Sequence, residues 1–251
     1  MKHSKQSNTD ENLQWAQRTM QLIGKERFDM LSQAHVLIAG MGGVGAMTAE
    51  MLGRAGIGTL TLVDNDKIQA SNINRQIAAL NSTEGEYKAD VMQRRLKDIN
   101  PAVQINIVKT YIREDTIDEL LDKPFDFVVD AIDTLSPKMD FIEKLYKKGY
   151  PFSSSMGSGG KTDPSKIAIA DFGKTYNCKL AYILRKKLRK RGINGGFNVV
   201  FSTELTDKAL LRMSENEPNK KSIPGTISYI PTIFGCFLAS IVVEGLTQKA
   251  V

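Results

Sequence analysis

Short apolar runs alternate with stretches of helical periodicity along most of the chain. Such runs predict strands, and they fall at residues 35–39, 59–63, 103–112, 125–131, 152–155, 167–170 and 199–202. The helical stretches fall at residues 10–31, 46–55, 88–99, 137–148 and 179–191. Strands that alternate with helices of about 10–15 residues predict an α/β fold, with a mostly parallel sheet and helices on both faces.

The chain beyond residue 171 departs from this alternation. A basic helical stretch is followed by a polar crossing loop at 215–224 and an apolar stretch at 226–246. The apolar stretch nearly reaches the roughly 20 residues that a transmembrane helix needs, but Pro231 and Glu244 interrupt it. We therefore expect a buried core helix or a dimer-interface helix there, and no membrane association.

These segments predict one folded domain with a distinct C-terminal extension. Residues 1–12 are polar and are expected to form a flexible N-terminus, and residues 13–251 form the domain. Within it, residues 13–170 form the core and contain all the predicted strands except the one at 199–202. Residues 171–251 contribute that strand, a basic substrate-binding extension and the apolar C-terminal helix.

Composition narrows the class of protein. The chain has 251 residues, of which 41% are hydrophobic and 25% charged, as in an ordinary soluble globular protein. The polar N-terminus contains no apolar segment typical of a secretory signal. Two cysteines, Cys178 and Cys236, do not make a disulfide framework, and no C-x-x-C pair is present. We therefore expect a cytoplasmic protein without a zinc site.

A glycine-rich turn follows the first apolar run and precedes a helical stretch. It reads Gly40-x-Gly42-Gly43-x-Gly45. In such a strand–turn–helix unit, the backbone approaches a phosphate closely, and the helix N-terminus favours negative charge. Asp64 ends the next apolar run, about 20 residues further on, where a carboxylate that binds ribose is expected. This much predicts a Rossmann-like nucleotide site, and a dinucleotide site remains an alternative.

Three further sequence elements follow in order and narrow the type of nucleotide site. They are the segment Ser71-Asn-Ile-Asn-Arg-Gln76, Lys88, and Asp133 at the end of a later apolar run. The carboxyl edge of an open α/β sheet is where ligands bind, so these residues are expected to surround one nucleotide. Taken alone, Arg75 and Lys88 could be surface charges, and Asp133 could cap the following helix.

This order of motifs resembles the adenylating enzymes related to ubiquitin-activating proteins, of the ThiF/MoeB type, over residues 18–170. The resemblance implies an ATP-binding adenylation fold and transfer of AMP to a carboxylate. By matching positions, it implies the following ATP-binding set: Gly40, Gly42, Gly43, Gly45, Asp64, Asp66, Asn72, Asn74, Arg75, Gln76, Lys88 and Asp133. It gives catalytic roles to Arg75, Lys88, Asp133 and Arg18. Asp133 would hold Mg²⁺, and Arg18 would extend into the neighbouring site of a homodimer.

Activators of sulfur-carrier proteins usually add two C-x-x-C pairs and a thioester-forming cysteine, which this chain lacks. We expect both cysteines to be core positions. Residues 13–247 are instead similar to the threonylcarbamoyladenosine dehydratase branch of the family. The matching segments are Gly42–Gly45, Ser71–Gln76, Asp130–Asp133, Ser154–Gly157, Asp163-Pro164 and Val199–Glu204.

This second resemblance implies ATP-dependent dehydration of the modified adenosine beside a tRNA anticodon to its cyclic form. It would proceed by adenylation of the threonine carboxylate and ring closure within the side chain. The alternative is adenylation of the C-terminus of a sulfur-carrier or ubiquitin-like protein. The branch also implies a sulfur-transfer partner and a monovalent cation near residues 157–160, whereas residues 219–225 lack the cysteine found there in some members.

The basic stretch fits a tRNA substrate, because phosphate contacts dominate nucleic-acid affinity. Its seven cations are Lys179, Arg185, Lys186, Lys187, Arg189, Lys190 and Arg191, with no acid among them. A solvated amphipathic helix without a partner is the alternative interpretation. Three aromatic residues are candidates for base stacking, but we expect each to be in the core: Phe197, Phe201 and Tyr182.

Overall fold

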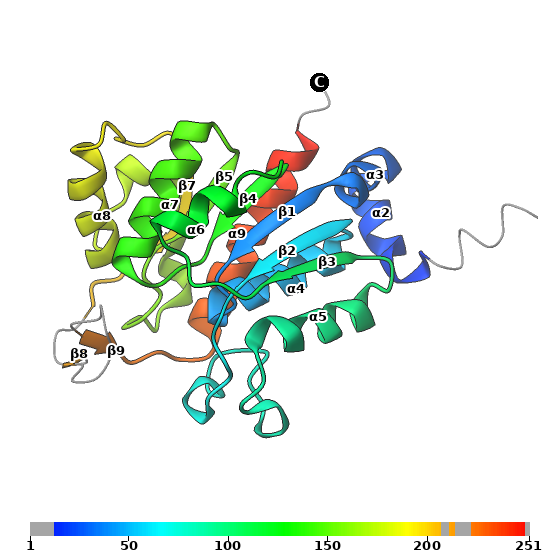
Figure 1. Cartoon of the computed structure of the whole chain (residues 1–251), viewed down its shortest axis with the longest axis horizontal. Coiled ribbons are helices and arrows are strands. Elements are labelled where there is room, and N and C mark those ends of the chain that lie inside the picture. Colours follow the sequence, from blue (N-terminus) through cyan, green and yellow to red (C-terminus); the bar gives the residue numbers. More distant parts are fainter. Residues whose placement is uncertain (1–12, 207–210, 214–221, 249–251) are drawn as a thin grey trace, which may run out of the picture.

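The computed structural model describes residues 13–206, 211–213 and 222–248 (Figure 1). A seven-stranded sheet has the order β3-β2-β1-β4-β5-β7-β6, and every pairing is parallel except that of β6 with β7. The strands are β1 (His35–Ala39), β2 (Thr59–Val63), β3 (Gln104–Val108), β4 (Phe127–Asp130), β5 (Phe152–Ser155), β6 (Ile167–Asp171) and β7 (Asn198–Ser202). The α/β prediction with a mostly parallel sheet is confirmed.

The burial of the central strand β1 explains why its sequence is apolar after His35. Successive side chains of a strand point to opposite faces. Val36 and Ile38 pack into the core on one face of the sheet, while Leu37 and Ala39 pack into the core on the other. All four are 0% exposed. Burial on both faces replaces polar–apolar alternation with a continuous apolar run.

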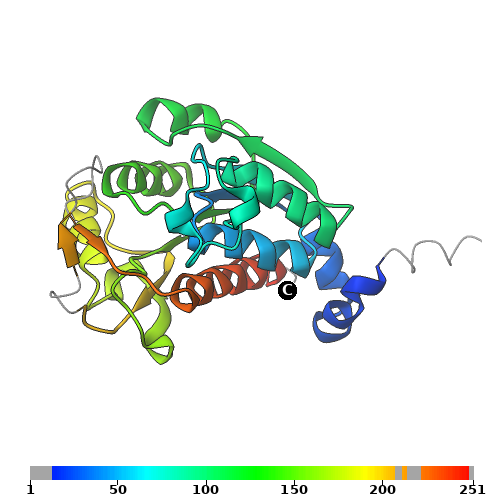
Figure 2. The ribbon, with the colours of Figure 1, turned by 90° about the horizontal axis from the view of Figure 1, so that it is seen from below.

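Helices cover both faces. On one side lie α4 (Gly43–Ala55), α5 (Lys88–Ile99) and α9 (Tyr229–Thr247), and on the other lie α6 (Glu114–Leu120), α7 (Leu135–Lys148) and α8 (Lys179–Arg189). Figure 2 shows α9 alongside α4, its main packing partner. Helix α6 was not predicted, because this part of the sequence shows no strong hydrophobic periodicity.

The apolar helix α9 is long and apolar enough to span a membrane by length and composition alone. In the fold it packs along α4 and against strands β4, β5 and β7. Phe234, Leu238 and Val242 are 0% exposed, while Ser240 and Glu244 face solvent. The core position expected from the sequence therefore accounts for the apolar character of this segment.

The extension beyond residue 171 completes the sheet. Its strand β7 lies between β5 and β6, and α8 packs beside α7. Strand β8 (Leu211–Met213) pairs antiparallel with β9 (Ser222–Pro224). Strand β9 falls inside the region 215–224 that was predicted as a crossing loop, and β8 precedes it. Residues 214–221 and the predicted flexible residues 1–12 lie outside the described parts of the chain.

Two predicted elements differ from the structure. The arm at 10–31 divides at Gly24, which has φ +85°, into α2 (Gln17–Ile23) and α3 (Lys25–Gln33), preceded by the short 3₁₀ helix η1 (Gln14–Ala16). The strand predicted at 103–112 ends at Val108, because β3 pairs only with β2, which has five residues.

Strand order also locates the ligand crevice. From β1 the chain proceeds outward through β2 and β3, and it then returns to β4 on the other side of β1. In open α/β sheets, the crevice at such a switch point, beyond the carboxyl ends of the strands, is where ligands bind. Gly40 follows β1 at this point, and Asp133 lies three residues beyond β4.

Candidate nucleotide site

The glycine turn links β1 to α4 in a geometry that excludes side chains at two positions. Gly40 has φ +95°, and a Cβ atom there would lie 2.9 Å from the carbonyl oxygen of Ala131. A Cβ atom on Gly45 would lie 1.7 Å from the carbonyl oxygen of Gly40. Gly40 and Gly45 are therefore required by the close packing of the turn on itself and on the start of the 131–134 loop.

Gly42 differs, because the space beside it is open. A Cβ atom there would approach only the side-chain amide nitrogen of Gln76, at 4.0 Å. Gln76 itself is 8% exposed, and its Oε1 atom has no hydrogen-bond partner among the described residues. Gly42 is also the N-cap of α4, whose first N–H groups point outward. An open cradle, free backbone donors and an unsatisfied amide are the features of a ligand site.

Two carboxylates follow β2 at the same edge. Asp64 accepts hydrogen bonds from the backbone N–H groups of Met41, at 2.6 Å, and Asp66, at 2.7 Å. Burial raises the pKa of Asp64 above its ordinary value, although Lys88 and the two N–H groups act in the opposite direction. Asp64 thus ties the glycine turn to β2, as a residue at the ribose position must.

Lys88 reaches the cluster from the first residue of α5. Its Nζ atom lies 2.7 Å from Oδ2 of Asp66. The Lys88 side chain is 7% exposed, whereas that of Asp66 is 63% exposed. The buried stem aims one ammonium group into the crevice, and its only ion-pair partner within the described parts of the chain is the exposed carboxylate of Asp66.

The Ser71–Gln76 segment supplies the arginine. Arg75 Nη1 donates to Asn74 Oδ1 at 2.8 Å and to the carbonyl oxygen of Ser71 at 3.0 Å. Asn74 in turn donates to the carbonyl oxygen of Thr226, at 2.9 Å, just before α9. Asn72 accepts from the Gln69 backbone N–H and shapes the 3₁₀ turn. These contacts hold the guanidinium at the crevice without using a carboxylate.

A buried ion pair that the sequence analysis did not predict lies close to Asp133. Lys138 and Asp130 are both 0% exposed, with Nζ and Oδ2 2.7 Å apart. Ser154 donates to Asp130 Oδ2 at 2.6 Å, and Lys138 also donates to the carbonyl oxygen of Ile132 at 3.0 Å. Burial lowers the pKa of Lys138, while Asp130 and Asp133 oppose that shift.

This ion pair fixes the loop that carries Asp133. The only sign of this ion pair in the sequence is that Lys138 stands among the apolar positions of α7. The N-cap position of α7 is Thr134, the residue after Asp133.

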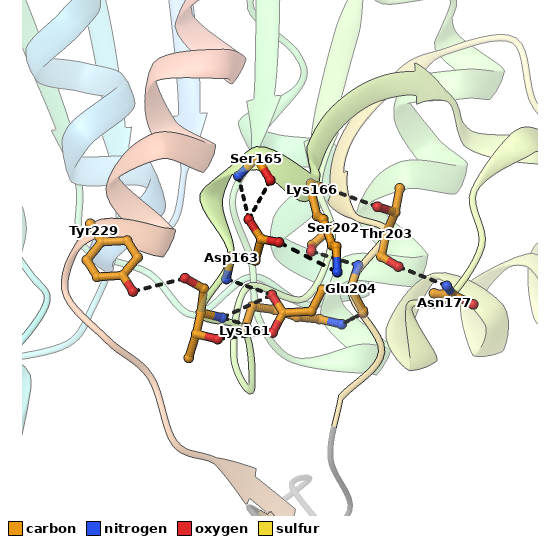
Figure 3. A network of polar contacts seen from close by, with 10 residues as sticks. Lys161, Asp163, Ser165, Lys166, Asn177, Ser202, Thr203, Glu204 and Tyr229 are labelled. Atoms are coloured by element: carbon orange, nitrogen blue, oxygen red, sulfur yellow. Dashed lines mark hydrogen bonds and ion pairs between the residues drawn. The ribbon is translucent and has the colours of Figure 1, made fainter.

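Residues 161–163, which directly follow the glycine-rich segment at 157–160, are held by Glu204 (Figure 3). The carboxylate of Glu204 accepts from the backbone N–H groups of Thr162, at 3.0 Å, and Asp163, at 2.9 Å. Lys161 donates to the carbonyl oxygen of Glu204, and Tyr229 donates to that of Thr162 at 2.9 Å. The loop after β5 is thereby tied to β7 and to the start of α9.

Both cysteines have the surroundings of packed side chains. Cys178 is buried against Gly157 and interacts electrostatically with Lys138, Lys161 and Arg185. Cys236 is half-buried in α9, and burial raises the pKa of its thiol. Within the described residues, no cluster of three or more Asp, Glu, His or Cys side chains could hold a metal.

Arg18 is not brought to this crevice. It is exposed on α2, and the following α3 joins the amino end of β1, at the far end of the sheet from the glycine turn (Figure 1). A hollow of about 490 Å³ also lies at the amino edge, beside Phe152, Asn198 and Gln248. It is therefore separate from the nucleotide crevice.

The basic helix α8 begins at the carboxyl edge, because Cys178, its N-cap, contacts the loop after β5. Arg191 is engaged by Asp140 at 3.0 Å and by Glu143, and Arg185 donates to Thr175. Phe197 and Phe201 are core residues as expected, but the same expectation for Tyr182 is wrong. Tyr182 is 60% exposed, because it lies opposite the buried Ala181–Leu184–Leu188 face of α8.

A family model described as the ThiF family matches residues 16–251. The chain belongs to the ThiF family. Among relatives of this ThiF-family chain, the tRNA threonylcarbamoyladenosine dehydratase of Bacillus subtilis is 37% identical over 233 residues, 90% of this chain and 92% of that protein. The protein of that name from Escherichia coli is 36% identical over 200 residues, 76% of this chain and 75% of that protein.

Solved structures give the same family. The Escherichia coli tRNA N6-threonylcarbamoyladenosine dehydratase TcdA, in complex with ATP, superposes with a TM-score of 0.86 at 31% identity. The match covers 95% of this chain and 96% of that one. The Rossmann-like adenylation fold expected from the motifs is therefore confirmed.

Proposed function

We propose that this ThiF-family protein is an ATP-dependent tRNA threonylcarbamoyladenosine dehydratase. It converts the threonylcarbamoyladenosine beside the anticodon to its cyclic form. The observation that carries the proposal is the convergence of the open glycine cradle, Lys88, Arg75 and the Asp133 loop on one edge of the sheet. Full-length similarity to proteins named for this activity supports the same assignment.

The residues at the crevice fit ATP. Phosphates would lie against Gly42, Gly43 and the N-terminus of α4, where no Cβ atom at Gly42 blocks the approach. The ribose hydroxyls would donate to Asp64, and Gln76, with its unsatisfied amide oxygen, would gain a partner. The remaining nucleotide-contacting residues of the proposal are Gly40, Gly45, Asp66, Asn72 and Asn74.

In the first step, the threonine carboxylate of the substrate attacks the α-phosphorus of ATP. A P–O bond forms to the carboxylate oxygen, and pyrophosphate leaves. Negative charge grows on the phosphate oxygens, so cations fixed in advance stabilise the transition state. Arg75 supplies a planar donor pair, and Lys88 supplies a point charge from a buried stem. Mg²⁺, held by Asp133, would neutralise part of the triphosphate charge.

In the second step, a nucleophile of the same side chain attacks the activated acyl carbon. The C–O bond to AMP breaks, a five-membered ring closes and a proton is released, so the nucleoside loses one water in total. Attack within one molecule needs no enzyme nucleophile and benefits from proximity. Neither cysteine is required, in agreement with the packed surroundings of both.

The proposal extends to assembly and location. Arg18 would serve the partner's site in a homodimer, because α2 lies at the far end of the sheet from the chain's own crevice. The basic residues of α8 and of the turn after it, from Lys179 to Lys190, would contact tRNA phosphates, apart from Arg185, which donates to Thr175. Arg191 is paired with Asp140 and Glu143. A cytoplasmic location rests on the cysteine usage and the polar N-terminus. A sulfur-transfer partner and a monovalent cation at 157–160 rest on the resemblance.

The test is nucleoside mass analysis of threonylcarbamoylated tRNA after incubation with the protein and MgATP. We expect loss of one water from the nucleoside, dependent on ATP. Arg75→Ala should abolish turnover while the protein stays folded, because Arg75 supplies the planar, bidentate cation of the proposal. Arg94→Ala is the matched control, since this arginine of α5 pairs only with Glu86 at the surface.

Normal turnover by Arg75→Ala would refute the role of that residue. An unchanged nucleoside, with intact tRNA and ATP, would refute the dehydratase proposal. Stable binding of a small protein that ends in Gly-Gly would then favour the protein-activating alternative.

A further inference from the structure

Helix α8 exposes a tyrosine on its most basic face. Ala181, Leu184 and Leu188 are 0% exposed and define the side that packs into the core. Tyr182 lies on the opposite side and is 60% exposed. Residues three and four positions apart are neighbours on a helix surface, so Lys179 and Lys186 flank the tyrosine ring.

The cations of this region divide into two groups. Arg191 is neutralised by two carboxylates of α7, and Arg185 is turned inward to Thr175. The other five are exposed and form no ion pair with any described residue. They are Lys179, Lys186, Lys187, Arg189 and Lys190. The exposed face of α8 is therefore purely cationic, apart from one aromatic ring.

The position of α8 shows where this cationic face lies relative to the crevice. Its N-cap, Cys178, lies against Gly157 at the carboxyl edge, and buried Lys138 interacts with both Cys178 and Asp133. The backbone N–H of Tyr182 donates to the carbonyl oxygen of Cys178 at 3.0 Å, so the ring is about one turn from that edge. From there α8 runs about 16 Å toward the amino edge, at 1.5 Å per residue.

We propose that Tyr182 stacks on an unpaired base of the tRNA anticodon loop, next to the nucleoside that enters the crevice. Lys179 and Lys186 bind the phosphates on either side of that base. The inference rests on the proposed function and adds to it the residue that holds the loop. Single-stranded RNA is held by stacking on aromatic rings combined with cations that follow the backbone, and this face offers both.

The test is the affinity of the full-length protein for an anticodon stem-loop RNA, measured by fluorescence anisotropy at several salt concentrations. Stacking on one aromatic side chain is worth about 1–3 kcal/mol, so Tyr182→Ala should weaken binding by about fivefold to a hundredfold. Tyr182→Phe keeps the ring and should bind within about twofold of the wild type. Tyr111→Ala, which removes an exposed tyrosine from the loop between β3 and α6, is the matched control and should not change the affinity.

Salt dependence separates the two kinds of contact. Tyr182→Ala should leave the slope of log affinity against log salt unchanged, because no phosphate contact is lost. Lys186→Ala should reduce that slope by about 0.7, the value for one phosphate contact with a single strand. ATP affinity should be unchanged in both variants, which shows that the fold and the crevice are intact.

An affinity of Tyr182→Ala equal to that of the wild type would overturn the inference while leaving the proposed function standing. A weakening shared equally by Tyr182→Phe would also overturn it, since the ring would then not be the contact. Failure of the wild type to bind or dehydrate the tRNA would instead refute the proposed function, and this inference with it.

Discussion

Replacement of Lys138 by methionine tests whether the buried ion pair supports the Asp133 loop. Methionine fills most of the space of the lysine stem but removes the charge opposite Asp130, whose side chain is 0% exposed. Removing one partner of a buried pair costs about 3–5 kcal/mol, because the other charge stays buried and uncompensated. Asp130 retains donors in Ser154 and the Ile132 N–H. We therefore expect the lower end of that range, about 3 kcal/mol.

The measurement is the free energy of unfolding by urea, together with the melting temperature. About 3 kcal/mol is a factor of roughly a hundred in the folding equilibrium. At about 2–4 °C per kcal/mol for a chain of this size, it lowers the melting temperature by about 6–12 °C. The control is Lys147→Met on the same helix, whose ion pair with Glu143 is at the surface and is worth at most about 1 kcal/mol.

A double variant, Asp130→Asn with Lys138→Met, separates charge from packing. It removes both charges and keeps an acceptor for Ser154, so it should regain much of the lost stability. The reasoning is refuted if Lys138→Met unfolds within about 1 kcal/mol of the wild type. It is also refuted if the double variant is no more stable than the single one.

Two other predictions follow from the crevice. Gly45→Ala places a Cβ atom within 1.7 Å of the Gly40 carbonyl oxygen, so the glycine turn must shift. We therefore expect this variant to lose ATP binding, as measured by calorimetry. The control Gly225→Ala, with open space around the added Cβ atom, should bind ATP normally. Burial raises the pKa of Asp64 above 3.8 in the folded state, so its ionised form destabilises the fold at neutral pH. Asp64→Asn does not titrate, so the stability of the wild type relative to this variant should rise as the pH falls from 7 through the raised pKa, as followed by urea unfolding; a constant difference would contradict the assignment.

Much of the site was predictable because its signals are local. The glycine turn needs its residue types for the backbone path, and β1 is apolar because a central parallel strand is buried on both faces. The order of Asp64, Arg75, Lys88 and Asp133 along the chain followed from motifs, and the strand order then brought the last residue to the same edge. Periodicity also gave α5 its correct bounds, Lys88–Ile99.

Other features depend on segments that are distant in sequence. Asp130 pairs with Lys138 and accepts from Ser154 only because α7 packs on β4 and β5 lies beside β4. Likewise, Arg191 reaches its carboxylates on α7 only because α8 packs beside that helix.

The sequence by itself determined the fold class and the glycine turn between β1 and α4, since both follow from periodicity and short-range backbone geometry. Only the tertiary structure decided which charges are buried, which are neutralised and which remain available. Tyr182 shows the difference: an aromatic residue in an amphipathic helix suggests the core, but α8 directs Ala181 and Leu184 inward and leaves the ring in solvent. Burial is a property of the packed chain, so composition and periodicity constrain it without determining it.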